Sequence, residues 1–299
     1  MESTATDKCA NCGKEGNSDD MNTCNKCKSV KYCNAACKKK HRTKHIKACE
    51  RRVAELYDEQ LFKEVEPEDC PICMLPLPIE RMNTTFESCC GKRICNGCSF
   101  AMEMSEGKDL CAFCRTPKFC SDEEMIKRLN KLIDNGNAGG FHQLAGLYAR
   151  GLSGIPQDRQ MANELLLKAG ELGCSDGYHN LAIAYYDGRG VEVDMKKAKH
   201  YFELAAMKGN VNARHNLSYI EEDAGKNERA YKHFILAAKA GHEKALDAVK
   251  QGFMKGLVSK DEYASTLRAY QKRQNEMKSD ERDQANAAYS HFDALTQGR

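Results

Sequence analysis

The chain has 299 residues, 17 cysteines and a formal net charge of +3, and its length favours two or three folded units over one. No apolar run approaches the roughly 18 residues that cross a membrane, and residues 1–9 hold no apolar segment typical of a secretory signal. We therefore expect a cytoplasmic or nuclear protein without a membrane partner, whose clustered cysteines bind metal rather than form disulfides.

Fifteen of the 17 cysteines lie in the first 114 residues and fall into two sets of eight metal-ligand residues. The first set is Cys9, Cys12, Cys24, Cys27, Cys33, Cys37, His45 and Cys49. The second set is Cys70, Cys73, Cys89, Cys90, Cys95, Cys98, Cys111 and Cys114. Zinc binds four Cys or His side chains tetrahedrally, so each set can hold two ions and the chain four. Apolar residues are sparse in this half, so metal must replace a hydrophobic core.

Residues 9–49 resemble the MYND zinc finger, whose ligands follow the order six Cys, one His, one Cys. The family spacing of seven residues between the sixth Cys and the His is met by Cys37 and His45. The resemblance implies one ion held by Cys9, Cys12, Cys33 and Cys37, and another held by Cys24, Cys27, His45 and Cys49. His41, one turn before His45, is an alternative ligand, although we favour a packing or surface role.

The stretch 38–52 carries eight basic residues and one acidic residue, which raises nucleic acid as a partner. Fifteen thiolates and four Zn²⁺ ions together change the formal net charge of the chain from +3 to about −4. Nucleic acid is therefore not expected, and the basic stretch offsets the zinc–thiolate centres beside it. Arg42 stands where many MYND fingers carry a Trp that docks proline-rich peptides.

A linker helix is predicted over residues 50–66, because Val53, Leu56, Tyr57 and Leu61 recur at helical spacing before Pro67.

Residues 67–118 resemble a RING-type zinc finger through three segments: Cys70-Pro71-Ile72-Cys73, Cys95-Asn96-Gly97-Cys98 and Cys111-Ala112-Phe113-Cys114. The resemblance implies one ion held by Cys70, Cys73, Cys95 and Cys98, and a second held by Cys89, Cys90, Cys111 and Cys114. Adjacent ligands on one ion are geometrically awkward, so Cys120 is an alternative to Cys89 or Cys90.

A RING finger in a ubiquitin ligase recruits a charged ubiquitin-conjugating enzyme and has no catalytic residue of its own. The resemblance implies that Ile72, inside the first Cys pair, contacts the conjugating enzyme. It also implies that Arg115, just after the last Cys, clamps the donor ubiquitin, a task that suits its planar fork of donors. The alternative is a RING-shaped scaffold that binds zinc and recruits nothing.

The second half of the chain contains internal repeats. The segment Gly140–Tyr148 is echoed by Gly177–Tyr185 at an offset of 37 residues. A second series repeats Ala162, Ala169 and Gly173 as Ala198, Ala205 and Gly209, and then as Ala230, Ala237 and Gly241. Each unit is predicted to be two helices ended by glycine, and the third unit is shorter by about one turn or loop.

These repeats resemble Sel-one-like repeats, relatives of the tetratricopeptide (TPR) repeat. The resemblance implies an α-solenoid over residues 121–256 that binds partner proteins, followed by a capping helix over 257–280 and a fraying tail at 286–299. The repeated His142, His179 and His215 suggest a metal stripe, but packing or hydrogen bonding between repeats is the preferred interpretation.

The predicted fold is mostly α: two small cross-brace zinc modules followed by an α-solenoid of helix-turn-helix repeats. The expected function is that of a zinc-binding protein-interaction protein that acts as a RING-type ubiquitin ligase. Helical repeats and the MYND-like finger then select the substrate. The alternative is a non-catalytic adaptor, and a methyltransferase is disfavoured because no strand-rich domain is evident.

Overall fold

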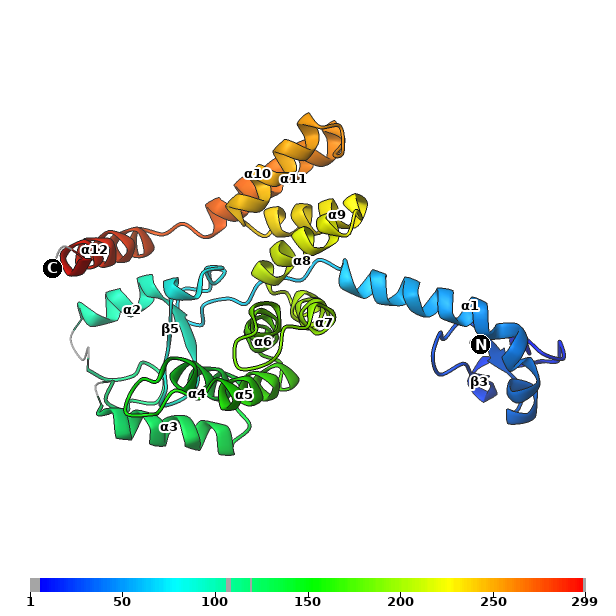
Figure 1. The fold of residues 1–299 in the computed structure, drawn as a ribbon, viewed down its shortest axis with the longest axis horizontal. Helices are drawn as coiled ribbons and strands as arrows, with labels where there is room; N and C mark the ends of the chain where they lie inside the picture. The colour runs from blue at the N-terminus through cyan, green and yellow to red at the C-terminus, as the bar shows by residue number, and fades with distance from the viewer. Residues whose placement is uncertain (1–5, 106–108, 119, 298–299) are drawn as a thin grey trace, which may run out of the picture. The chain divides into compact units, whose positions relative to one another are not determined.

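The computed structural model describes residues 6–105, 109–118 and 120–297, with side chains as far as Tyr289. Parts of the leader and tail predictions, at residues 1–5 and 298–299, therefore lie outside the described residues. The described residues form twelve α-helices and three two-stranded sheets (Figure 1). They divide into two compact units, and the boundary along the chain lies between Lys63 and Glu64.

The first unit is small and built around sulfur. Two antiparallel hairpins pair β1 (Thr6–Lys8) with β2 (Glu15–Asn17) and β3 (Asn22–Thr23) with β4 (Lys31–Tyr32), and η1 (Ser18–Asp20) lies between β2 and β3. The long helix α1 (Ala35–Leu61) follows and includes most of the predicted linker helix, but it ends at Leu61. The buried side chains of this unit's core are Cys9, Met21, Cys24, Cys27, Tyr32 and Cys49.

The second unit begins with the second Cys-rich module. It comprises η2 (Arg81–Asn83), the hairpin of β5 (Thr84–Phe86) and β6 (Arg93–Cys95), and the short helix α2 (Asn96–Glu103). Its buried centre is Cys70, Ile94, Cys95 and Cys98, so sulfur again replaces a hydrocarbon core.

A stack of paired helices makes up the rest of the second unit. It starts with α3 (Asp122–Asp134). Three antiparallel pairs follow: α4 (Ala138–Arg150) with α5 (Arg159–Glu171), α6 (Ser175–Asp187) with α7 (Met195–Met207), and α8 (Val211–Asp223) with α9 (Asn227–Lys239). The helices α10 (Glu243–Met254) and α11 (Lys260–Glu276) close the stack, and each pair contacts the next, as Figure 1 shows.

The repeated alanines are buried where helices pack together, and the repeated glycines end helices, as their spacing predicts. The six alanines of the series are at most 1% exposed and allow neighbouring helices to approach closely. Gly173, Gly209 and Gly241 have φ values of 106°, 85° and 104°, a left-handed conformation that ends a helix readily only at glycine. The side chains of Asp158 and Asp194 cap α5 and α7 by accepting backbone N–H bonds.

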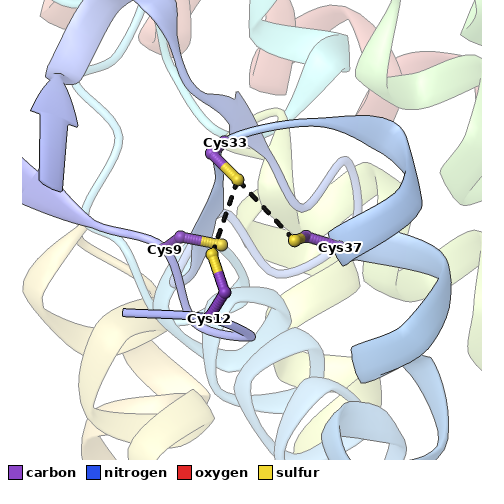
Figure 2. A group of neighbouring side chains, drawn as sticks. All are labelled: Cys9, Cys12, Cys33 and Cys37. Carbon is purple, nitrogen blue, oxygen red and sulfur yellow. Dashed lines mark hydrogen bonds between the residues drawn. The ribbon is translucent and has the colours of Figure 1, made fainter. Parts of the chain in front are cut away.

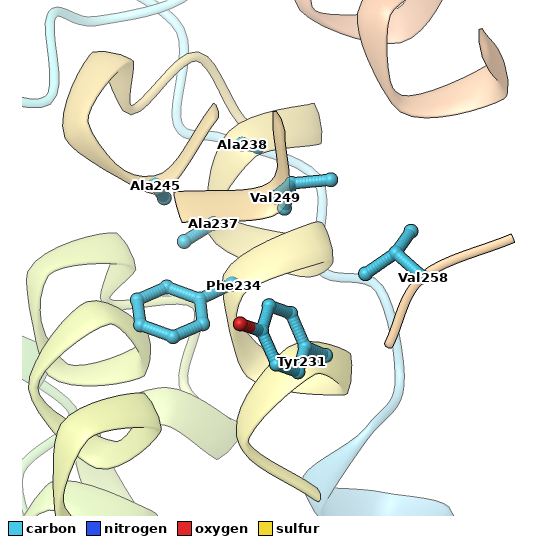
Figure 3. Close-up of a cluster of buried hydrophobic side chains, with 7 residues drawn as sticks. All are labelled: Tyr231, Phe234, Ala237, Ala238, Ala245, Val249 and Val258. Atoms are coloured by element: carbon cyan, nitrogen blue, oxygen red, sulfur yellow. The ribbon is translucent and has the colours of Figure 1, made fainter. Parts of the chain in front are cut away.

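The third repeat is shorter in its loop and not in its helices. Residues 224–226 join α8 to α9, whereas residues 151–158 join α4 to α5, and all four helices have 13 residues. Beyond this loop, α9 and α10 share a buried cluster with Val258, drawn in Figure 3: Tyr231, Phe234, Ala237, Ala238, Ala245 and Val249.

The tail differs from the prediction of fraying. Residues Asp280–Gln297 form α12, which packs against α2 of the second Cys-rich module. Ser279 Oγ accepts the N–H of Arg282 at 3.2 Å, and Asp280, Glu281 and Asp283 fill the first turn, where carboxylates favour a helix. Ala285 is fully buried.

We predict that Gly177→Ala lowers the free energy of unfolding by about 1–3 kcal/mol, the usual cost of overpacking. A Cβ atom there meets Gly170 N and Leu166 O at 2.7 Å, and these backbone atoms of α5 cannot rotate away. Urea unfolding followed by far-ultraviolet circular dichroism measures the change.

Gly146→Ala is the matched control, since its Cβ meets only the mobile tip of Arg150 at 3.3 Å. Alanine has the higher helix propensity, so this variant should be unchanged or more stable by up to about 1 kcal/mol. Equal stability of the two variants would contradict the close approach of α5 and α6.

Candidate metal centres

The structure collects all sixteen predicted ligands into four groups of four, with the ligand atoms of each group within 4.8 Å of one another. The first group is Cys9, Cys12, Cys33 and Cys37, shown in Figure 2. Two of these come from the turn after β1, one follows β4 and one lies in the first turn of α1. Cys33 Sγ is 3.6 Å from both Cys12 Sγ and Cys37 Sγ.

The second group is fully buried and consists of Cys24, Cys27, His45 and Cys49. His45 and Cys49 lie one turn apart on α1, and His45 Nε2 is 3.2 Å from Cys27 Sγ. His41 stays outside the group: its Nδ1 pairs with the Tyr32 hydroxyl at 3.2 Å, and its ring stacks on that of His45. His41 therefore has the packing role that the sequence favours.

The second module holds the other two groups, with its Cys pairs interleaved as in the first. Cys70 and Cys73 meet Cys95 and Cys98, and Sγ distances of 3.8 Å join Cys70 to Cys98 and Cys73 to Cys95. The backbone N–H groups of Cys95 and Cys98 donate to sulfur at 3.5 Å, and such bonds stabilise thiolates.

The adjacent pair Cys89 and Cys90 joins one group with Cys111 and Cys114. A tight turn makes this possible: the N–H groups of Cys90 and Gly91 both donate to Glu87 O, and Gly91 has a φ of 72°. Cys120, the alternative ligand, is exposed and belongs to none of the four groups.

The sulfur separations distinguish a metal site from a disulfide. A tetrahedral ion with Zn–S bonds of about 2.3 Å separates its sulfurs by about 3.8 Å, whereas a disulfide bond is about 2.05 Å long. The separations recorded across the four groups run from 3.3 to 3.8 Å. All 17 cysteines are free thiols, so the donor sets fit four zinc ions and no disulfide.

Four backbone turns share one unusual geometry. After four of the five Cys-x-x-Cys pairs the next residue, Gly13, Lys28, Met74 or Arg115, has a φ between 57° and 74°, whereas the fifth pair, Cys95 and Cys98, begins α2. In the four turns the N–H of that next residue donates to the carbonyl of the first Cys at 2.9–3.1 Å. A left-handed conformation is strained in the three non-glycine residues, and such strain persists only where surrounding structure imposes it.

Some thiols of each module have lowered pKa values, which favours the thiolate form that binds a metal cation. The N–H of Cys33 lowers the pKa of Cys9 to about 6 by donating to its sulfur. Burial alone raises the pKa of Cys24, but N–H bonds from Cys27 and Lys26 bring it to about 6. In the second module burial is likewise outweighed, and backbone N–H groups hold the pKa of Cys70 at about 7.

Other thiols in the same groups resist ionisation. Hydrogen bonding to Cys12 and Cys37 raises the pKa of Cys33 to about 12, and burial followed by the Cys27 thiol raises that of Cys49 to about 11. Three or four thiolates cannot share so small a space without a cation between them, because like charges at this distance repel strongly. A divalent ion removes this repulsion, which is what a structural zinc supplies when bound.

Arg282 of α12 is a residue that the sequence did not identify. It is 6% exposed, and its Nη1 donates to Pro76 O at 2.9 Å and to Met277 O at 3.0 Å. Its Nη2 lies 3.5 Å from Cys73 Sγ and from Leu75 O. Gly97 gives room for this contact, and Phe100 meets Tyr289 edge-on. A cation therefore ties the last helix to the negative sulfur group.

The repeated histidines form hydrogen bonds between repeats. Asn180 Nδ2 is 3.0 Å from His142 Nε2, and Asn216 Nδ2 is 3.3 Å from His179 Nε2. Burial lowers the pKa of His179 to about 4, so its ring is neutral and can accept such a bond. None of these histidines belongs to a metal group among the described residues.

The two predicted contact residues lie on different turns of the second module. Ile72 is 39% exposed between Cys70 and Cys73. Arg115 is exposed directly after Cys114.

Comparison with known families agrees with this geometry. The family model of the MYND finger matches residues 9–49, and that of the Sel1 repeat matches residues 142–174, 175–210 and 213–242. The chain contains a MYND finger and three Sel1 repeats. Both are protein–protein interaction modules. Neither match extends over residues 70–114, the second Cys-rich module.

Solved structures include similar helical repeats. A Sel1 repeat protein from Oxalobacter formigenes is 24% identical, covering 50% of this chain and 64% of its own, with a TM-score of 0.44. A protective antigen of uropathogenic Escherichia coli strains with an SLR fold is 22% identical, covering 50% of this chain and 33% of its own, with a TM-score of 0.42. The match thus spans less than two thirds of either protein. No curated protein matches the chain, and no described helix has the length and apolarity to cross a membrane.

We expect four zinc ions per purified chain by elemental analysis. Chelation should unfold residues 9–115 while most helical circular dichroism remains, since the repeats bury their own core and each structural zinc contributes about 10–16 kcal/mol of apparent binding energy. Two ions or fewer, or modules that stay folded after chelation, would contradict the assignment.

Arg282→Ala should release α12 from the second module, because it removes the hydrogen bonds to the Leu75 and Pro76 carbonyls. Hydrogen exchange should then accelerate at least about tenfold over residues 280–289, while α4 to α9 keep their protection. Arg268→Ala, at an exposed position on α11, is the control. Unchanged exchange in α12 would show that Arg282 does not hold it.

Proposed function

We propose that the sixteen grouped side chains bind four zinc ions and that the second module is a RING-type finger of a ubiquitin ligase. The observation that carries this proposal is the exposure of Ile72 and Arg115 on the rigid turns of a cross-braced Cys module. The ligase holds no catalytic group: it brings a charged conjugating enzyme close to a substrate.

Ile72 is suited to contact another protein because its turn is fixed on both sides. Cys70 and Cys73 belong to the same sulfur group, and Met74 N donates to Cys70 O at 2.9 Å. Met74 is 72% exposed beside it, so the tip of this turn presents apolar surface to solvent. Apolar side chains on rigid turns lose little entropy when they bind.

Arg115 is suited to bridge two proteins. It lies on the turn closed by its own N–H to Cys111 O at 3.0 Å, and its side chain is exposed. A guanidinium offers five donors in a planar fork and can reach carbonyl groups on two partners at once. A clamp on donor ubiquitin requires this chemistry, and lysine does not reproduce it.

In this proposal the MYND finger and the Sel1 repeats select the substrate. Helix α1 presents Ile46 of the MYND finger and, beyond the finger, Val53 and Tyr57, each 37–45% exposed, along one side. They border a groove of about 980 Å³ between the Cys24 turn and α1. This groove and the surface of the Sel1 repeats give the protein two sites for partner proteins.

The second candidate function is a non-catalytic adaptor, favoured by the attachment of the second module to the repeats. Phe86 packs into the cluster of Leu129, Leu144 and Leu147, and Arg81 pairs with Asp176. These contacts are consistent with a module that only extends the scaffold.

Ubiquitination assays separate the two functions. Zinc-loaded protein is incubated with activating enzyme, a panel of conjugating enzymes and ubiquitin. We expect chains with at least one conjugating enzyme, loss of enzyme binding in Ile72→Ala, and in Arg115→Ala slower ubiquitin transfer, about tenfold or more, with enzyme binding retained.

Met82→Ala is the control for these variants, because Met82 is 80% exposed in the same module but belongs to no sulfur group. Zinc content must stay the same in all three variants. Absence of product with every conjugating enzyme would leave the adaptor function.

A further inference from the structure

A cavity of about 770 Å³ lies between the β5–β6 hairpin of the second module and the first two Sel1 repeats. Five arginines line it: Arg81, Arg93, Arg150, Arg159 and Arg189. Among the described residues that line it there is no Asp or Glu. The remaining polar lining includes His142, Asn163 and Asn180, so the wall is rich in hydrogen-bond donors.

Only two of these arginines are paired with a carboxylate. Arg81 pairs with Asp176, and Arg189 pairs with Asp187 at 2.6 Å. Arg93, Arg150 and Arg159 have no carboxylate partner among the described residues. The wall thus carries three positive charges without a carboxylate partner among the described residues, one on half-buried Arg93 and two on exposed Arg150 and Arg159.

Arg93 is the most informative of the three. Its Nη1 donates to Thr84 Oγ1 at 3.2 Å and its guanidinium lies over the Phe86 ring, so it is held on β6. Burial lowers its pKa, and Cys174 and then Glu68 act in the opposite direction only through space. Arg93 is half-buried, and a charge partly removed from water without a paired anion destabilises a fold, which makes a missing counter-ion the simplest account.

Individual nitrogen atoms of two neighbouring side chains on the same wall also lack a hydrogen bond within the described part of the chain. Arg81 Nε and Nη1 and His142 Nδ1 are buried without a hydrogen bond among the described residues. The pKa of His142 is held well below its ordinary value, first by burial and then by the charges of Arg81 and Arg93. The His142 ring is therefore neutral, and its pKa should respond to an anion that binds beside Arg81 and Arg93.

We propose that this cavity binds a ligand carrying a phosphoryl group. A single carboxylate is satisfied by one arginine, whereas a phosphoryl group has up to two negative charges and three acceptor oxygens for several guanidinium forks. The volume exceeds that of a lone phosphate and suits an attached organic group, which the side chains of Leu166 and Ile183 can pack against.

Because Arg81 and Arg93 come from the zinc-dependent module and the other three arginines come from the repeats, the ligand bridges the two. This site does not depend on ligase activity, and its test is separate.

Calorimetric titration of the zinc-loaded full chain tests the site with three probes: inorganic phosphate, a short phosphoserine peptide, and the same peptide with glutamate. We expect one phosphoryl probe to bind and the glutamate peptide to bind at least about tenfold more weakly. Preference for the phosphopeptide identifies a phosphorylated partner protein, and preference for phosphate identifies a small phosphate ester.

Arg150→Gln and Arg93→Gln should each weaken that binding about tenfold, whereas Arg268→Gln, which removes the same charge from α11, should not. Arg150 is exposed, so its variant keeps the test valid if loss of half-buried Arg93 disturbs folding. NMR titration should also show a rise in the pKa of His142 with ligand, because an anion favours the imidazolium. No binding of either phosphoryl probe, equal binding of the glutamate peptide, or equal loss in Arg268→Gln would overturn the proposal.

Discussion

Repulsion between thiolates held within 4.8 Å of one another is the constraint on which both Cys-rich modules depend. Their buried centres consist mainly of sulfur, with Tyr32 or Ile94 as the largest hydrocarbon contribution. A divalent cation converts this repulsion into the interaction that holds each module together. The strained turns at Lys28, Met74 and Arg115 each follow a Cys pair of a different sulfur group, and a fixed pair of sulfurs can impose that backbone conformation.

The repeats are held together by a hydrocarbon core instead of sulfur groups. Both kinds of core occur in the second unit. Alanines bring helices close within the stack, and Phe86 of the second module enters the cluster at its beginning. At the other end of the chain, Arg282 reaches back to Cys73 and Pro76. The second module is therefore fixed to the repeats through Phe86 and to the tail helix through Arg282, and metal binding there contributes to the stability of the helices that contact it.

Local patterns predicted the ligand groups and the repeats well, because each depends on short spacings. The i, i+4 pair His45 and Cys49 and the helix-ending Gly173 are examples. The tail helix was missed, although Ser279 followed by three acidic residues is a helix-start pattern. The arginine cavity could not be predicted, since Arg93 and Arg150 meet only through the folding of two modules onto each other.

Backbone strain bears on the choice between ligase and adaptor. The position after four of the Cys-x-x-Cys pairs has a left-handed backbone, and Gly13 occupies it without strain. Met74 and Arg115 occupy this left-handed position at a cost of about 1 kcal/mol or more. Both side chains are exposed to solvent. A module that served only to bind zinc would be more stable with glycine at both positions. Exposed, non-glycine side chains at these positions therefore favour contact with another protein, as the ligase function proposed above would require.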